Sequence, residues 1–198
     1  MRDDGITPSQ TVGPFFKYGL TPVGQYDWDD AFTNNLVTSD VSGDRIRIEG
    51  RVFDGDGVPV PDSMLEIWQA DSQGRFADPK DKRALPNAKF RGFGRCGTDA
   101  NGAFAFDTIM PGQVADLDGK PQAPHILLAV FARGMLRHLY TRIYFGDEAG
   151  NADDSVLALV PADRRVTLIA QRKAGNGGAV YALDIRLQGD GETVFFDI

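Results

Sequence analysis

Closely spaced turn signals limit what this 198-residue chain can fold into, because they leave room only for short segments of regular structure. Asp and Asn can hydrogen-bond to their own turn, and Gly supplies the positive φ that a tight turn needs. The signals are D-G-D-G at 54–57, D-S-Q-G at 71–74, D-A-N-G at 99–102, P-G-Q at 111–113, L-D-G-K at 117–120 and G-N-G-G at 175–178. Short strands between frequent turns are typical of a β-sandwich.

The segments between these turns alternate between apolar and polar residues. In 45–49, Ile46 and Ile48 alternate with charged residues, and a similar alternation runs through 181–187. This period of two is expected of half-buried strands. The stretch 126–130 is apolar throughout, which favours a strand covered on both faces. We therefore predict an all-β, single-domain β-sandwich with Greek-key-like short strands.

Two regions depart from this pattern. Residues 1–40 show little periodicity and contain three prolines, so we predict an extended N-terminal arm that needs something to pack on, followed by the sandwich over residues 41–198. Helix is predicted to be scarce, with one or two short helices. Asp153 or Asp154 could cap one of them over 155–159, ending before Pro161.

Composition argues against several classes of partner. The formal net charge is −7 and no cluster of Lys and Arg is visible, so neither nucleic acid nor an anionic membrane is an expected partner. The longest apolar run, 126–132, is far shorter than the roughly 20 residues of a membrane helix. With a polar, acidic N-terminus and Cys96 as the single cysteine, the sequence predicts a soluble, cytoplasmic protein.

Several separated segments, in the same order along the chain, carry a family resemblance. Together they resemble the intradiol ring-cleaving dioxygenases, over nearly the whole chain. The segments are T-P-S-Q-T-V-G-P-F at 7–15, L-E-I-W-Q-A-D-S-Q-G-R-F at 65–76, T-I-M-P-G-Q-V at 108–114, A-P-H-I-L-L-A-V-F at 123–131, F-A-R-G at 131–134, H-L-Y-T-R-I-Y-F at 138–145 and G-E-T-V-F-F-D-I at 191–198.

The resemblance also indicates what this chain lacks. Iron-bearing members hold iron(III) with a G-R-Y tyrosine, a P-G-x-Y tyrosine and an H-x-H pair, and phenolate oxygens suit this hard cation. The corresponding positions here are Phe76, Val114, His125 and Leu127. Three of them offer no donor atom, so the resemblance is to the subunit that binds no metal. We expect His125 to be a structural histidine at the start of its strand.

The resemblance further implies a function in a hetero-oligomer with a homologous, iron(III)-bearing beta subunit. The pair would cleave protocatechuate with dioxygen to 3-carboxy-cis,cis-muconate, on the β-ketoadipate route of aromatic catabolism. This chain alone would be inactive and would bind no cofactor. Thr11, Gly13, Pro14 and Arg133 would wall the partner's pocket, with the Arg133 guanidinium pairing with the substrate carboxylate.

Other interpretations stay open at this stage. The chain could be a non-enzymatic carrier or assembly module that lost the metal site, or a homo-oligomeric enzyme with another site. Arg133 could form an internal salt bridge instead. Cys96 is expected to be a core residue and not a nucleophile. His138, Tyr140 and Tyr144 share a strand face and could form a ligand set, although an interface ridge is the commoner outcome.

Overall fold

The computed structural model describes residues 19–21, 33–85, 89–116, 118–173 and 178–197, and within them it confirms the all-β class. Strands dominate, and three short 3₁₀ helices (η) are found in the described part. The elements are β1 Arg45–Phe53, β2 Met64–Trp68, β3 Phe93–Gly97, β4 Ala103–Ile109, β5 Val114–Ala115, β6 Pro121–Gln122, β7 His125–Phe131, β8 Leu139–Phe145, η1 Ala149–Asp153, η2 Leu157–Leu159, η3 Arg165–Leu168, β9 Ile169–Lys173, β10 Ala179–Ala182 and β11 Ile185–Arg186.

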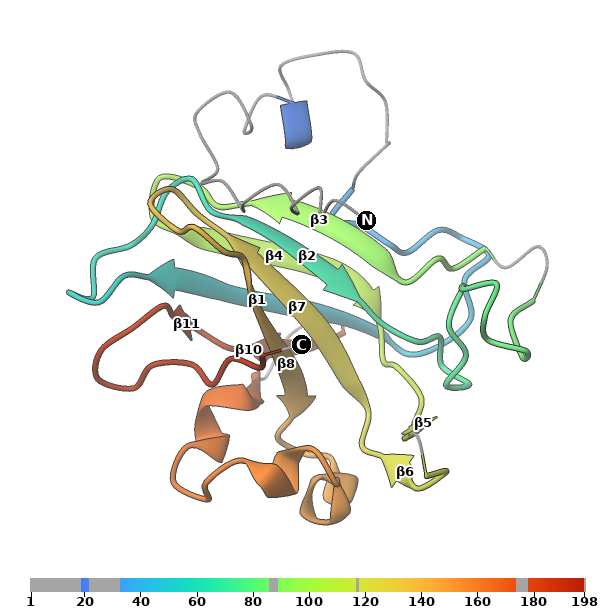
Figure 1. The fold of residues 1–198 in the computed structure, drawn as a ribbon. Coiled ribbons are helices and arrows are strands. Elements are labelled where there is room, and N and C mark those ends of the chain that lie inside the picture. The colour runs from blue at the N-terminus through green and yellow to red at the C-terminus, as the bar shows by residue number, and fades with distance from the viewer. Residues whose placement is uncertain (1–18, 22–32, 86–88, 117, 174–177, 198) are drawn as a thin grey trace, which may run out of the picture.

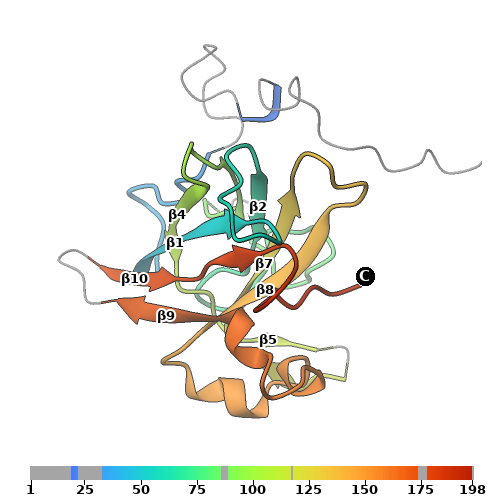
Figure 2. The same ribbon diagram turned by 90° about the vertical axis from the view of Figure 1, so that its left-hand side faces the viewer.

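The main sheet is continuous and strongly bent. Its order is β4–β1–β10–β9–β8–β7–β2–β3, and β11 pairs with the far end of β1. The β1–β10, β1–β11 and β8–β9 pairs are parallel, and the others are antiparallel. The edge strands β3 and β4 come close to each other, so the sheet is nearly closed. The η segments lie beyond one end of β7 and β8 (Figure 1), and β9 and β10 extend to one side as a pair (Figure 2).

Four of the predicted turns share one hydrogen-bond pattern. In each, Oδ1 of an Asp accepts the backbone N–H groups two and four residues later, and a Gly with positive φ stands three residues after the Asp. The carboxylate therefore closes the turn that the Gly makes sterically accessible. The pairs are Asp54 with Gly57, Asp71 with Gly74, Asp99 with Gly102 and Asp116 with Gly119.

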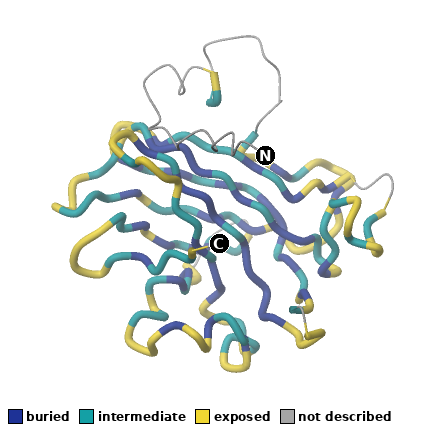
Figure 3. Tube along the Cα trace, viewed as in Figure 1, coloured by how far each residue is buried: buried dark blue, intermediate teal, exposed yellow. Residues whose placement is uncertain are grey.

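The core lies between the two halves of the bent sheet. Inward-facing side chains of β1 and β4, such as Ile48 and Phe106, belong to one buried cluster with Ile67, Leu128 and Ile143 of β2, β7 and β8. Figure 3 shows this burial along the middle of the strands, with the turns exposed. A second, smaller cluster joins Tyr144 and Ala123 to the η segments.

The predicted strands are found, with one break. The segment 45–49 begins β1 and alternates as expected, and 126–130 lies in β7. The alternating segment 181–187 is divided between β10 and β11, because Leu183 and Asp184 bond to β1 outside regular pairing: Leu183 N–H donates to the Glu49 carbonyl, and Asp184 accepts from Arg51 N–H.

Both chain ends, where the structure describes them, make contacts with this chain's own sheet and core. Residues 33–40 belong to the expected arm, yet Leu36 is buried in this chain's own core, and Arg95 N–H donates to the Thr33 carbonyl. The aromatic ending also packs on its own sheet, where Phe196 N–H donates to the Tyr140 carbonyl at 2.8 Å. The rest of the arm, residues 1–18 and 22–32, lies outside the described residues.

Of the two candidate caps, Asp154 makes hydrogen bonds to the turn before η2, whereas the N-cap residue of η2 itself is Val156, which makes no side-chain cap bond. The buried Asp154 carboxylate accepts the backbone N–H groups of Val156 and Leu157 at 3.0 and 2.7 Å, just ahead of η2. No helix in the described part of the chain is both long and apolar enough to cross a membrane.

Candidate functional site

His125 lies at the start of β7 and faces away from the main core, covered by the smaller cluster. Its side chain is buried, Nδ1 donates to the Ala123 carbonyl at 2.8 Å, and its ring lies 5.7 Å from that of Tyr144. Burial, followed by the positive charge of Arg142, lowers the pKa of His125 to about 4. The imidazole is therefore neutral near pH 7, as expected of a structural histidine.

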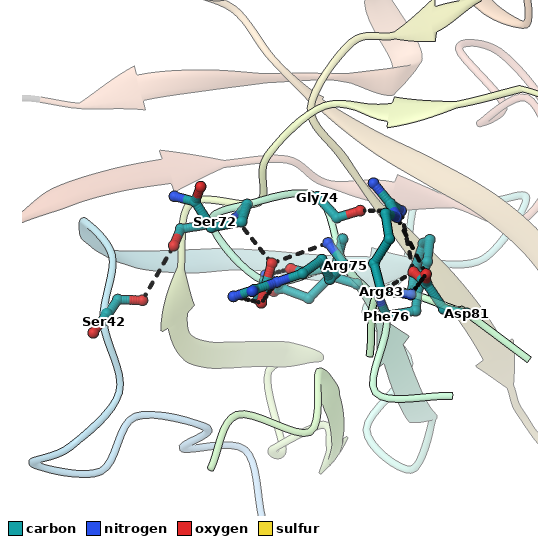
Figure 4. Close-up of polar contacts among 11 residues, drawn as sticks. Ser42, Ser72, Gly74, Arg75, Phe76, Asp81 and Arg83 are labelled. Atoms are coloured by element: carbon teal, nitrogen blue, oxygen red, sulfur yellow. Dashed lines mark hydrogen bonds and ion pairs between the residues drawn. The ribbon is translucent and has the colours of Figure 1, made fainter. Parts of the chain in front are cut away.

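Phe76 stands in the turn that follows β2, where the hydrogen-bond network of Figure 4 holds the backbone. Its N–H donates to Asp81 Oδ2 at 3.0 Å, and Arg83 donates to the Gly74 carbonyl at 2.7 Å. The contact with Arg83, and then the Phe76 N–H, lower the pKa of Asp81 to about 2. The Phe76 ring stacks on Trp68, with centroids 6.0 Å apart and an angle of 11° between the planes.

Leu127 and Val114 lie on segments that neighbour those of His125 and Phe76. Leu127 is paired across the strands with Trp68, and by alternation it shares a face of β7 with His125. Val114 is paired with Gln122, and its segment is held against the 71–74 turn by the Gly112 N–H donating to the Asp71 carbonyl at 2.8 Å.

The residues at these positions do not fit an iron(III) ion. The structure brings Phe76, Val114, His125 and Leu127 to one end of the β2–β7–β8 surface, but only the imidazole carries a donor atom. A hard ferric ion needs several oxygen or nitrogen ligands, and one neutral imidazole does not supply them. Among the described residues, no group of three or more His, Cys, Asp and Glu stands ready to hold a metal ion.

A cavity of about 610 Å³ lies over the outer face of this sheet. Most of its lining is apolar, and aromatic side chains are prominent. The residues around it are Glu66, Ile67, Trp68, Phe93, Leu127, Ala129, Tyr140, Thr141, Arg142, Val156, Phe196 and Asp197. Of the four positions that the resemblance assigns to the metal site, Leu127 lines this cavity.

Arg142 brings a positive charge into this apolar cavity. Its Nη1 donates to Gln122 Oε1 at 2.6 Å and to the Tyr144 hydroxyl at 3.2 Å, and the Tyr144 hydroxyl donates to Asp154 Oδ1 at 3.0 Å. Burial raises the pKa of Tyr144 far above its usual value, so its hydroxyl stays protonated. It can therefore accept from Arg142 while it donates to Asp154.

Arg133 follows β7 and forms an ion pair with Asp62. The internal salt bridge that the sequence left open is thus present, while 59% of the Arg133 side chain remains exposed. Its expected companions Thr11, Gly13 and Pro14 lie outside the described residues.

The other residues considered from the sequence have structural surroundings. Cys96 packs against the core, and burial raises the pKa of its thiol, which disfavours a nucleophile. His138 Nε2 is 2.7 Å from the Tyr140 hydroxyl, and its ring stacks on Phe131. Tyr144 is buried beside Arg142 and bonds to Asp154, so the three side chains do not form a common ligand set.

Sequence reasoning missed Arg142 and Trp68. A usable signal was present for Arg142, because the alternation of 138–145 places it on the same face as Tyr140 and Tyr144. Nothing in the sequence marks Trp68, whose stacking on Phe76 depends on the path of the loop.

Comparison with known proteins supports the resemblance. The family model described as "Dioxygenase" matches residues 13–189. The chain is 48% identical to the protocatechuate 3,4-dioxygenase alpha chain of Burkholderia cepacia, covering 97% of both chains. It is 34% identical to the protocatechuate 3,4-dioxygenase beta chain of the same organism, covering 87% of this chain and 76% of that one.

A solved structure shares the fold. The dioxygenase domain of a dioxygenase–carbohydrate-binding protein fusion from Streptomyces sp. SirexAA-E superposes with a TM-score of 0.63 at 25% identity, over 92% of this chain and 99% of that one. Because the family model matches most of the chain and the 48% identity to an alpha chain extends over nearly its full length, this chain belongs to the family of intradiol ring-cleaving dioxygenases.

Proposed function

We propose that this chain is the alpha subunit of a protocatechuate 3,4-dioxygenase and that it completes the active site of an iron(III)-bearing beta subunit. The observation that carries the proposal is the near full-length, 48% identity to an alpha chain. The donor-poor side chains at Phe76, Val114 and Leu127 support it further, because they leave the iron to a partner.

The proposed partner is a homologue of this chain. The likeness to a beta chain of protocatechuate 3,4-dioxygenase supports a pair of related subunits that pack as a hetero-oligomer. In this pair the beta subunit holds the iron, which supplies the site where the catechol and dioxygen react. The alpha chain contributes pocket walls and charge, and the product is 3-carboxy-cis,cis-muconate.

Arg133 is the proposed contact of this chain with the substrate carboxylate. Asp62 contacts Nε, so the terminal nitrogens of the fork are the ones that would meet the carboxylate of a bound aromatic acid. The ion pair with Asp62 would then hold the guanidinium in position. Thr11, Gly13 and Pro14 of the arm are proposed to line the same pocket, since the Gly-Pro backbone allows close approach to a ligand.

We propose two further details that accompany this function. The halves β3–β2–β7–β8 and β9–β10–β1–β4 act as the two layers of a sandwich, which the shared core between them supports. The N-terminal arm, residues 1–40, packs on the beta subunit in addition to the contact that Leu36 makes with this chain's own core. A cytoplasmic location fits the single cysteine and the acidic composition.

Co-expression tests the proposal. The chain is produced together with a homologous beta chain that carries the iron ligands, and oxygen uptake with protocatechuate is measured for the pair and for each chain alone. The pair is expected to consume oxygen and form 3-carboxy-cis,cis-muconate, whereas this chain alone does neither. Failure of the two chains to co-purify, or turnover by this chain alone, would overturn the proposal.

A further inference from the structure

The Arg142 guanidinium is a cation without a carboxylate partner. Among the ion pairs between described residues, none involves Arg142, and the two side chains to which it donates, Gln122 and Tyr144, are neutral. Asp154 is linked to Arg142 indirectly, through the Tyr144 hydroxyl. Its carboxylate is already occupied by backbone N–H groups, including that of Ala123 at 2.8 Å. A partly buried, unpaired cation favours an anionic ligand.

The walls of the cavity fit a flat apolar ligand. Trp68 and Phe93 come from β2 and β3, Phe196 from the chain end, and Leu127 and Ala129 from β7. A mostly apolar cavity of about 610 Å³ with a few convergent polar groups has the build of a small-molecule site.

The acidic residues at the cavity do not cancel its attraction for an anion. Glu66 is neutralised by Arg95, whose Nε donates to Glu66 Oε1 at 2.8 Å. Asp197 is exposed near the chain end, where solvent screens its charge. Arg142 is therefore the charge that a ligand in the cavity would meet.

We infer that this cavity binds a small aromatic monocarboxylate, with the carboxylate on Arg142 and the ring against Trp68 and Phe93. The inference concerns binding alone, and Leu127, the one degenerate metal-site position in the cavity lining, carries no donor atom. This binding goes beyond the proposed function: it requires neither iron nor the beta subunit, and it is separate from the pocket to which Arg133 would contribute.

Fluorine NMR of 4-fluorobenzoate tests the inference on the full 198-residue chain, or on the chain in its complex. The probe cannot be cleaved as a catechol, and 4-fluorobenzamide is its neutral control. The chain is expected to bind the carboxylate, and to bind the amide at least about tenfold more weakly, because a charge-assisted hydrogen bond is lost.

Two variants address the cavity directly. Arg142→Gln keeps a hydrogen-bonding side chain but removes the charge, so affinity should fall about tenfold to a hundredfold. Ala129→Phe fills the cavity without changing its charge and should abolish binding. Arg45→Gln makes the same charge change at an exposed residue outside the cavity and should bind like the wild type.

In a complex, the probe could also bind in the beta subunit's own pocket, so the experiment measures the number of probe-binding sites per alpha–beta pair. Arg142→Gln should remove one site per alpha–beta pair, and Arg133→Ala should leave that site intact. Absence of binding to the wild-type chain at millimolar probe, or equal binding by Arg142→Gln, would overturn the inference. The inference would also be overturned if the wild-type chain did not bind the probe and Ala129→Phe caused loss of the beta subunit. A segment of the partner would then fill the cavity.

Discussion

At the scale of single residues, Arg133→Ala should act mainly on substrate capture. Charge-assisted hydrogen bonds contribute roughly 1.5–3 kcal/mol, so kcat/KM of the complex for protocatechuate should fall about tenfold to a hundredfold. Catechol, which has no carboxylate, should lose much less. Steady-state oxygen uptake with both substrates measures the difference.

Asp62 provides the matched control for this prediction. Asp62→Asn removes the ion pair seen in the structure but keeps the guanidinium, so kcat/KM for protocatechuate should change far less than in Arg133→Ala. If both variants lower the rates with both substrates equally, Arg133 has a structural role through Asp62 and does not contact the substrate.

His125 should make folding stability depend on pH. Its pKa falls from an ordinary 6.5 to about 4 in the folded chain. The unfolded chain therefore binds more protons between these values, and stability decreases as the pH falls through this window. From pH 7 to pH 5 this single group should cost about 2 kcal/mol, measured as the change in the free energy of unfolding in urea.

The second histidine of the chain is a natural control. His125→Gln should lose this part of the pH dependence, whereas His138→Gln, at an exposed position, should keep it. An unchanged pH dependence in His125→Gln would show that the imidazole is not held neutral by its surroundings.

The absence of donor atoms at Phe76, Val114 and Leu127 is visible in the letters themselves, and their assignment to a degenerate metal site stays a prediction. Partners are harder to predict. The pairing of Arg133 with Asp62, and of Arg142 with Gln122, joins residues far apart in the sequence. Such contacts depend on how loops and strands pack, which no local pattern encodes.

At the scale of elements, Asp154 joins the η segments to the sheet. Its buried carboxylate accepts from Ala123, Val156, Leu157 and the Tyr144 hydroxyl. Asp154→Ala would leave several buried donors unsatisfied and should cost at least about 3 kcal/mol of folding stability. Thermal or urea unfolding measures the loss.

The neighbouring Asp153→Ala removes the same charge from an exposed residue and should change stability by less than about 0.5 kcal/mol. Similar losses in the two variants would mean that Asp154 has no special part in holding the η segments to β6 and β8.

Elements were predictable where local chemistry decides them. The D-x-x-G turns and the alternation of β1 follow directly from residue type. The division of 181–187 into β10 and β11 does not, because it results from contacts with β1 that lie more than 100 residues away in the chain. The order of strands depends on such long-range pairing in the same way.

At the scale of the whole molecule, the lone chain is expected to self-associate. The aromatic ending packs on its own sheet, so the exposed apolar side chains that favour self-association lie elsewhere. Leu136, Leu159 and Val166 remain 70%, 82% and 64% exposed, and exposed apolar surface favours association. Sedimentation velocity should show aggregates for the chain alone and a defined species after co-expression with the beta chain. A stable, monodisperse monomer would contradict this.

Iron content tests the central claim most directly, namely that this chain belongs to an iron dioxygenase but holds no iron itself. Metal analysis and the visible spectrum are compared for the purified lone chain and for the alpha–beta complex. The lone chain should contain no stoichiometric iron and lack the phenolate-to-iron charge-transfer band, while the complex should contain about one iron per pair and show the band. About one tightly bound iron per lone chain would contradict the account.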